Sequence, residues 1–337
     1  MRVLHRLGFT LIATFVAPLV ALVVLTHIVH ALTLDRIIEY REISMQSPRW
    51  PEALDGYRIA FIADVHTTPD AILQGIVGEL NARGIDMLLL GGDFSIAGGR
   101  YRAAIAVLSQ VQTTDGIFGV EGNHDNYIRL FAAMEHYGVV PLSNSGLAVR
   151  DGFFLAGVED MRRRNSCIAT ATAAAQNDDF VLLVSHNPDL TMRQDTTGVD
   201  LILSGHTHGG HITFFGLWAP YLTLRNSITD YGQRFASGWA RSRDGVPVYV
   251  NTGTGRYYGI PRVFARPQVT LLTLHSGGTA CRTSEDKSFW SNGYVIIALL
   301  LLIWAGGYWV CRPRTMINHR FLSRLLLSVC RRGKPLV

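Results

Sequence analysis

Five short apolar segments of this chain each end in a small group of polar residues. Carboxylate oxygens, imidazole nitrogens and amide oxygens are the ligands that divalent metal ions take from proteins. The ends of strands are places where such ligands can meet from distant parts of a chain. The pattern therefore predicts a metal enzyme. The polar groups, in order, are Asp64-Val65-His66, Gly91-Gly92-Asp93, Gly122-Asn123-His124-Asp125, Ser185-His186 and Gly205-His206-Thr207-His208.

The spacing inside these groups supports a shared ion site. Asp64 and His66 are two residues apart, so in an extended segment both side chains project to the same side. His206 and His208 repeat that spacing, and Asp93 follows two glycines that allow a tight turn. A single Asp at a strand end is more often a helix cap, and a single His is more often a hydrogen-bonding residue. The occurrence of all five groups in this order favours metal ligation.

The body of the chain, residues 42–275, is predicted to form one α/β domain, because short apolar strands alternate with amphipathic segments. Further strands are expected at 153–158, 246–250 and 269–274, the last two with antiparallel or edge character. The strands that precede the polar groups are expected at 59–63, 87–90, 117–120, 181–184 and 201–203, with helices at 71–83, 101–112 and 128–137.

Two stretches lack charged residues, at 7–34 and 288–311. A membrane-spanning helix needs roughly 20 apolar residues. We therefore expect transmembrane helices at 9–34 and 289–311. A cleavable signal peptide is the alternative for the first stretch, although the apolar core of a signal peptide is usually only about 7–15 residues long.

The net charge of +5 comes from the end of the chain, where residues 312–337 hold seven basic residues and no acidic one. The rest of the chain is not basic, which argues against nucleic-acid binding. The basic segment alternates Arg with Leu and Phe, as an amphipathic helix in the cytoplasmic membrane interface would. Together with Arg2 and Arg6 it predicts, by the positive-inside rule, a multi-pass protein of the inner or plasma membrane with an extracytoplasmic catalytic domain.

The five polar groups resemble the motifs of the calcineurin-like metallophosphoesterase superfamily over about residues 57–275. Ser185-His186-Asn187-Pro188-Asp189 and the glycine-rich block that ends at Gly210 are most similar to the branch of membrane-associated phosphodiesterases that includes YkuE and YaeI. The resemblance implies a four-layer β-sandwich flanked by helices. It also implies two divalent ions, Mn, Fe or Zn: one held by Asp64, His66 and His208, the other by Asn123, His186 and His206, with Asp93 between them.

In such a site the two ions activate a water molecule for in-line attack and neutralise charge on the phosphoryl oxygens. The resemblance implies that His124 protonates the leaving oxygen or stabilises the transition state, and that Asp125 orients the His124 ring. The alternative for His124 is a hydrogen bond within its own loop.

Two segments are candidates for substrate contacts. Arg162, Arg163 and Arg164 could bind an anionic headgroup or a diphosphate, although charge runs usually face water. The apolar segment 214–221 could line an acyl-chain groove, touch the membrane or simply pack in the core.

The leading hypothesis is a membrane-anchored two-metal phosphohydrolase that cleaves a phosphodiester or diphosphate bond of a small, lipid-linked substrate by metal-activated hydroxide. One alternative is a UDP-2,3-diacylglucosamine hydrolase of lipid A synthesis, although that substrate is expected on the cytoplasmic face of the membrane. A second alternative, from another class, is a non-catalytic metal-binding membrane sensor or scaffold.

Overall fold

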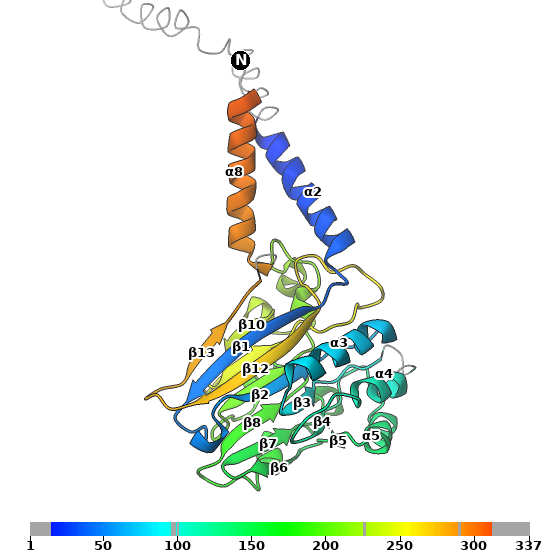
Figure 1. Ribbon diagram of the computed structural model, residues 1–337, viewed down its shortest axis with the longest axis vertical. Helices are drawn as coiled ribbons and strands as arrows, with labels where there is room; N and C mark the ends of the chain where they lie inside the picture. The colour runs from blue at the N-terminus through cyan, green and yellow to red at the C-terminus, as the bar shows by residue number, and fades with distance from the viewer. Residues whose placement is uncertain (1–14, 96–98, 100, 225–226, 289–290, 312–337) are drawn as a thin grey trace, which may run out of the picture. The chain divides into compact units, whose positions relative to one another are not determined.

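The computed structural model describes residues 15–95, 99, 101–224, 227–288 and 291–311. The chain divides into two compact units, one of residues 1–24 and 295–337 and one of residues 25–294. The larger unit contains two β-sheets (Figure 1).

The first sheet has seven strands in the order β13-β1-β12-β2-β3-β4-β5. β2, β3 and β4 run parallel, so their carboxyl ends lie at one edge of the sheet. The strands are β1 (Glu39–Ser47), β2 (Tyr57–Ile62), β3 (Met87–Leu90), β4 (Ile117–Gly119), β5 (Val140–Pro141), β12 (Gln268–Ser276) and β13 (Arg282–Glu285).

The second sheet has six strands in the order β10-β11-β9-β8-β7-β6. β7, β8, β9 and β11 are parallel to their neighbours within this group, while β6 and β10 pair antiparallel at the two edges. The strands are β6 (Ser145–Arg150), β7 (Phe153–Gly157), β8 (Phe180–Val184), β9 (Leu201–Ser204), β10 (Gly238–Arg241) and β11 (Pro247–Val250).

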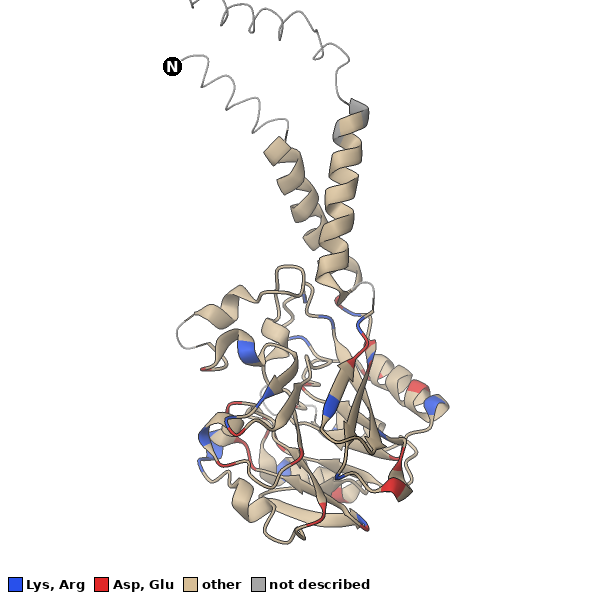
Figure 2. Cartoon of the chain, turned by 90° about the vertical axis from the view of Figure 1, so that its left-hand side faces the viewer, with Lys and Arg blue, Asp and Glu red and all other residues tan. Residues whose placement is uncertain are grey.

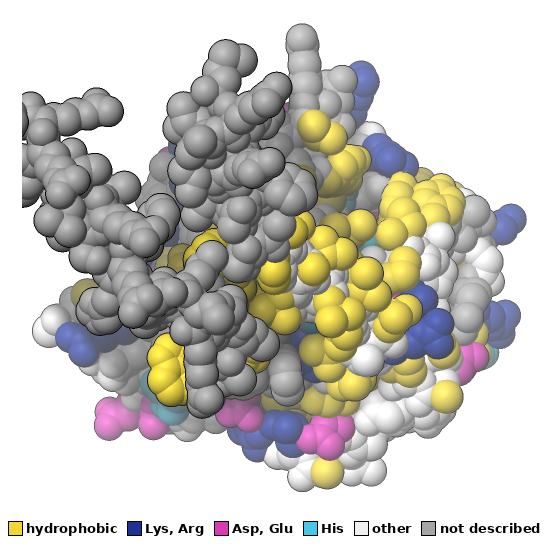
Figure 3. All heavy atoms as spheres, turned by 90° about the horizontal axis from the view of Figure 1, so that it is seen from above, with side chains coloured by type: hydrophobic (Ala, Val, Ile, Leu, Met, Phe, Trp, Pro, Cys, Tyr) yellow, Lys and Arg dark blue, Asp and Glu magenta, His cyan; other side chains and the backbone are white. Residues whose placement is uncertain are grey.

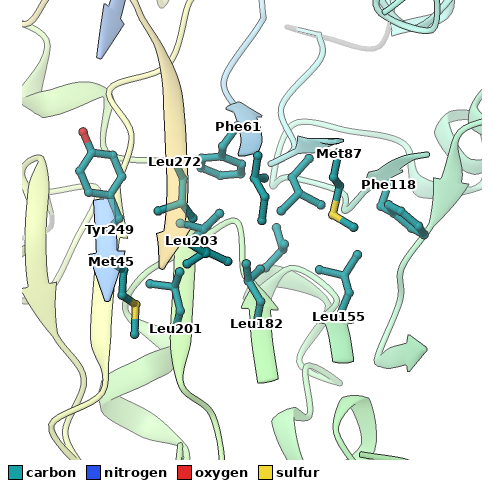
Figure 4. Packing of buried hydrophobic residues seen from close by; sticks show 14 of the residues in the cluster. Met45, Phe61, Met87, Phe118, Leu155, Leu182, Leu201, Leu203, Tyr249 and Leu272 are labelled. Atoms are coloured by element: carbon teal, nitrogen blue, oxygen red, sulfur yellow. The ribbon is translucent and has the colours of Figure 1, made fainter. Parts of the chain in front are cut away.

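The two sheets pack face to face around the main core. Side chains alternate along each strand, so one set fills the space between the sheets and the other set faces outward. Phe61 and Met87 of the first sheet face Leu182 and Leu155 of the second in this core (Figure 4). The sandwich fixes the strand ends of both sheets relative to each other, which is what the functional site requires.

Helices cover both outer faces of the sandwich. The outward residues Ala60 and Ile62 of β2 pack against α3 (Asp70–Arg83), together with α4 (Tyr101–Leu108) and α5 (Tyr127–His136) (Figure 1). The second sheet is covered by shorter elements: α6 (Ile168–Ala171), α7 (Leu190–Arg193) and the 3-10 turn η6 (Gly232–Phe235). Other 3-10 turns are η2 (Glu52–Leu54), η3 (Met161–Arg163), η4 (His208–Gly210) and η5 (Pro220–Thr223).

The predicted mixed α/β architecture is confirmed, with two sheets. β11 and β12 each have one antiparallel partner, as expected, and each is an interior strand because a parallel partner pairs on its other side. The first sheet also extends beyond residues 42–275. Its strand β1 begins at Glu39, and β13 pairs with β1 from residues 282–285.

The two predicted transmembrane helices coincide in part with α2 (Ala17–Thr33) and α8 (Gly293–Cys311), which carry no Asp, Glu, Lys or Arg (Figure 2). However, none of the helices in the described ranges is long and apolar enough to cross a membrane. The described helices therefore do not support the two predicted spans. Residues 9–14 and 289–290 and the predicted basic tail at 312–337 lie outside the described residues.

Candidate metal centre

The five polar groups lie directly after the carboxyl ends of β2, β3, β4, β8 and β9. The loops after β2, β3 and β9 are strained, because Asp64, His66, Asp93, His206 and His208 all have positive φ angles, between 39° and 72°. A non-glycine residue in this region costs about 1–3 kcal/mol, and such strain concentrates at functional sites. The structure thus holds these side chains in positions that ordinary loops would not adopt.

Two glycines permit the close approach of these loops. A Cβ atom at Gly122 would lie 2.2 Å from Asp93 Oδ1, and one at Gly205 would lie 2.6 Å from Asp64 Oδ2. Both positions therefore exclude any side chain, since these distances are far below van der Waals contact.

Two groups of ligand atoms result, each with its members within 4.8 Å of one another. The first cluster is Asp64, His66 and His208, and the second cluster is Asp93, His186 and His206. In the first, His208 Nε2 lies 3.1 Å from His66 Nε2 and 3.4 Å from Asp64 Oδ1.

Asp93 lies between the clusters. Its Oδ2 is 3.3 Å from His186 Nε2 and 3.5 Å from His66 Nε2, so one oxygen faces both groups. Asn123 adds an amide oxygen to the second cluster, with Oδ1 3.1 Å from His186 Nε2. The structure brings together all seven residues that the sequence nominates as metal ligands.

The site fits a pair of cations. Asp64 Oδ1 is buried and has no hydrogen-bond partner among the described residues, which is costly for a carboxylate oxygen unless a cation contacts it. His186 Nδ1 lies 2.7 Å from the Gly91 carbonyl and His206 Nε2 lies 2.9 Å from the Ile228 carbonyl. A carbonyl fixes the proton on that nitrogen and leaves the other ring nitrogen free to bind a metal.

The charges of the site also suit cations. Burial lowers the pKa of His66 to about 4 and that of His206 to about 3, so both rings are neutral at pH 7 and offer lone pairs. Burial alone would raise the pKa of Asp93, but the charge and hydrogen bond of His186 outweigh it and hold that pKa well below its usual range. Burial raises the pKa of Asp64, and the nearby Asp93 charge adds to the rise. A bound cation would stabilise the ionised form of Asp64 in this pocket.

The comparisons with known proteins agree with this geometry. The family model described as calcineurin-like phosphoesterase matches residues 57–210. The chain belongs to the calcineurin-like phosphoesterase family. The matched region contains all the predicted metal ligands, and members of this family use divalent metal ions.

Three relatives illustrate the match. The chain is 28% identical over 69% of its length to a transmembrane protein with metallophosphoesterase domain from Danio rerio. It is 26% identical over 71% of its length to the uncharacterised metallophosphoesterase YkuE of Bacillus subtilis, and 26% identical over 65% to the phosphodiesterase YaeI of Escherichia coli. The aligned region spans 56% of the Danio protein, 86% of YkuE and 82% of YaeI.

A cavity of about 680 Å³ opens over both clusters of this phosphoesterase and is lined by Asp93, Asn123, His124, His206 and His208, among others. The His124 ring lies 5.5 Å from the His66 ring, measured between centroids. It therefore faces the space where a substrate would meet the metal ions.

Asp125 does not act as the sequence predicts. Its two oxygens accept hydrogen bonds from the backbone N–H groups of Asp93, Phe94 and Gly122, at 2.8 to 3.0 Å, rather than from the His124 ring. Those donors are close because the loops after β3 and β4 cross at this point. Asp125 therefore ties the two loops together, and it does not orient His124.

The three predicted substrate-binding arginines have different surroundings. Arg162 lines the cavity and donates to the Asn123 carbonyl at 2.8 Å. Arg163 pairs with the buried Glu121 at 3.1 Å and lies over the Tyr127 ring, so its charge is already engaged. Arg164 is exposed and does not line the cavity. Of the three, Arg162 alone has a geometry that suits a substrate contact.

Sequence reasoning missed two residues of the site. Tyr257 lines the cavity, with its ring centroid 5.6 Å from that of His124. Arg262 is fully buried and donates from Nη2 to His208 Nδ1 at 3.0 Å. Its signal in the sequence is a single charge between Pro261 and Val263, inside an otherwise apolar stretch.

Proposed function

We propose that this phosphoesterase hydrolyses a phosphodiester or diphosphate bond of a lipid-linked small molecule at a membrane. The observation that carries the proposal is the pair of clusters that share Asp93 at the base of one cavity. When bound, two divalent ions would supply an activated water and neutralise charge on the phosphoryl group.

In this proposal Asp64, His66 and His208 hold one ion, Asn123, His186 and His206 hold the other, and Asp93 faces both. The carbonyls behind His186 and His206 keep those rings in the orientation that ligation needs.

The protein's own side chains do the remaining work. His124 faces the cavity beside the first cluster and would deliver a proton to the leaving oxygen. Arg162 lines the same cavity and would hold the phosphate by charge-assisted hydrogen bonds, since the backbone of Asn123 fixes the guanidinium there. Tyr257 lies beside the His124 ring in the same cavity.

The membrane part of the proposal rests on other observations. The uncharged stretches at 7–34 and 288–311, with a basic segment after the second, favour membrane attachment with the catalytic domain outside the cytoplasm. Helix α8 exposes large apolar side chains, among them Leu302 and Ile303. The Danio relative is itself described as a transmembrane protein.

The test is hydrolysis of a panel of substrates by the full chain in detergent, with the chelated protein as its control. The panel contains an activated soluble phosphodiester, a glycerophospholipid, an isoprenyl diphosphate and UDP-2,3-diacylglucosamine. We expect metal-dependent release of a phosphoryl product from at least one lipid. Hydrolysis of the soluble ester alone would remove the lipid from the proposal, and no hydrolysis by the metal-loaded protein would favour a sensor or scaffold.

A further inference from the structure

A group of exposed apolar side chains surrounds one side of the cavity mouth. We call it the apolar rim: Ile212, Phe214, Leu217, Trp218, Tyr221 and Ile260, each of which exposes between 42% and 48% of its surface. Three of them, Ile212, Tyr221 and Ile260, also line the cavity above the metal ligands. The rim is therefore continuous with the site where the phosphate would bind.

The rim is held outward by a fixed loop. Phe215, Ala219 and Leu222 of the same segment are at most 2% exposed and anchor it in the protein. The side-chain amide of Gln233 accepts from Ala219 N at 2.9 Å and donates to Ala219 O at 2.7 Å. Because the inward residues are fully packed, the outward ones cannot fold into the core, and their exposure is a stable feature of the surface.

The apolar surface continues onto the end of α2 in the same unit. His27 packs against Phe214 and Phe215 with ring centroids 5.3 and 4.7 Å apart. Close to this contact in the helix sequence, Ile28 and Leu32 expose 49% and 77% of their surface. Figure 3 shows hydrophobic side chains gathered on this face of the molecule.

We infer that the apolar rim docks on the surface of a lipid bilayer and inserts among its acyl chains. Exposed apolar patches of this kind mark interaction sites. Residues 211–224 contain no Lys, Arg, Asp or Glu, whereas the borders of protein–protein interfaces are polar. Trp218 and Tyr221 are the aromatic types that favour the headgroup boundary of a membrane, where the ring is apolar and its N–H or O–H meets water.

This arrangement defines how substrate reaches the site. An amphiphile in the bilayer would keep its hydrocarbon chains against the rim. Its phosphate would enter the cavity past the side chains of Ile212 and Ile260. This second step rests on the proposed function, whereas docking of the rim on lipid does not.

Docking is tested without any substrate. The full chain is transferred from detergent into phosphatidylcholine vesicles with or without brominated acyl chains, and quenching of tryptophan fluorescence is compared with that of Trp218→Phe. We expect Trp218→Phe to remove a quenched component of the signal. Trp239→Phe, the matched control on β10 beside Tyr249, should not remove one. An unchanged quenched signal in Trp218→Phe overturns the inference, whatever else covers the rim.

A kinetic test addresses substrate delivery. For Phe214→Ser combined with Leu217→Ser, we expect the ratio of kcat/KM for a lipid phosphate in vesicles to kcat/KM for a soluble phosphodiester to fall about tenfold, as lost apolar contacts would cause. A ratio within about twofold of the parent value overturns delivery through the rim. If the unmodified protein cleaves neither substrate, the proposed function fails, while the quenching result still decides docking.

Discussion

The two metal clusters contain the same residue types but are supported differently. In the second cluster, backbone carbonyls face the outer nitrogens of His186 and His206. In the first, the outer nitrogen of His208 faces the guanidinium of Arg262 at 3.0 Å. Arginine has only donors, so His208 Nδ1 must accept this hydrogen bond. In the neutral ring the proton then lies on Nε2, the nitrogen that faces His66 and Asp64.

This difference indicates that the histidine rings of the second cluster are already oriented for a cation, whereas His208 of the first cluster is not. Carbonyls already orient His186 and His206 for ligation, although the Asp93 carboxylate keeps His186 protonated until an ion displaces that proton. His208 has to release the Nε2 proton, or turn away from Arg262, before Nε2 can bind an ion. Metal binding at the first cluster should therefore be weaker, because it also has to break the Arg262–His208 hydrogen bond or displace the Nε2 proton.

The largest expected effect comes from the residue that both clusters share. Asp93 Oδ1 accepts a hydrogen bond from the backbone N–H of His124 at 2.7 Å. Asp93→Asn keeps an oxygen for this hydrogen bond but removes the negative charge between the clusters. We expect metal content to fall at both clusters and kcat to fall on the order of 10³-fold or more, as for other residues that act as part of a unit. Elemental analysis and turnover of a soluble phosphodiester measure the two effects. Asp151→Asn, an exposed carboxylate in a turn, is the control.

If Asp93→Asn retained two ions per chain, Asp93 would not link the clusters, and the two clusters would be independent metal sites.

Removal of His124 should separate proton delivery from metal binding. His124→Ala should keep both ions, because neither cluster includes His124, but should lose about 10²–10⁴-fold in kcat if the ring protonates the leaving oxygen. The effect should shrink for an ester whose leaving group needs no proton. His136→Ala, an exposed His on α5, is the matched control. Unchanged turnover in His124→Ala would remove His124 from the mechanism.

A smaller effect, on metal affinity, tests whether the different partners of the outer histidine nitrogens make the two clusters unequal. Partners of the outer His nitrogen typically change metal affinity by about 10–100-fold, so we expect two binding steps separated by a gap of that order. Metal titration of the chelated protein should resolve these two steps. His206→Ala should remove the tighter step and His66→Ala the weaker one. Two equal steps would contradict the asymmetry inferred from Arg262.

The sequence predicts the strand-end part of this site well because the information there is local. Each ligand follows an apolar strand within a few residues, and parallel strands bring their carboxyl ends to one edge. The whole predicted ligand set consequently meets in space. The helices predicted at 71–83 and 128–137 are also confirmed, because their bounds differ from those of α3 and α5 by at most one residue.

What the sequence does not predict depends on partners far along the chain. Strand β1 begins with two buried charged residues, Glu39 and Arg41. They pair with each other, and Arg41 also pairs with Glu285, which lies 244 residues further along the chain. No local pattern reveals such pairing. Asp125 is misjudged for a related reason: it is adjacent to His124 in sequence, but the crossing of two loops gives its oxygens backbone partners instead.

The smallest expected effect concerns the stability of the metal-free protein, to which His66 and His186 contribute in different pH ranges. Burial lowers the pKa of His66 to about 4 from an ordinary 6.5, so stability is lost as the pH falls between those values. Burial disfavours the charged form of His186 as well, but the Asp93 carboxylate outweighs it and raises the pKa of His186 well above 6.5. The His186 contribution is full below pH 6.5 and is lost as the pH rises through the raised value.

Thermal unfolding in chelator of the parent, His66→Asn and His186→Asn separates these windows. The difference between the parent and His66→Asn should change between pH 6.5 and pH 4, and that between the parent and His186→Asn only above pH 6.5. Each should amount to a few degrees, since about 1 kcal/mol shifts Tm by about 2–4 °C in a domain of this size. Differences are needed because Asp64 and Asp125, whose pKa values burial raises, titrate in the opposite sense to His66. A His66→Asn curve parallel to the parent below pH 6.5 would mean that His66 is not a buried neutral ring in the folded protein.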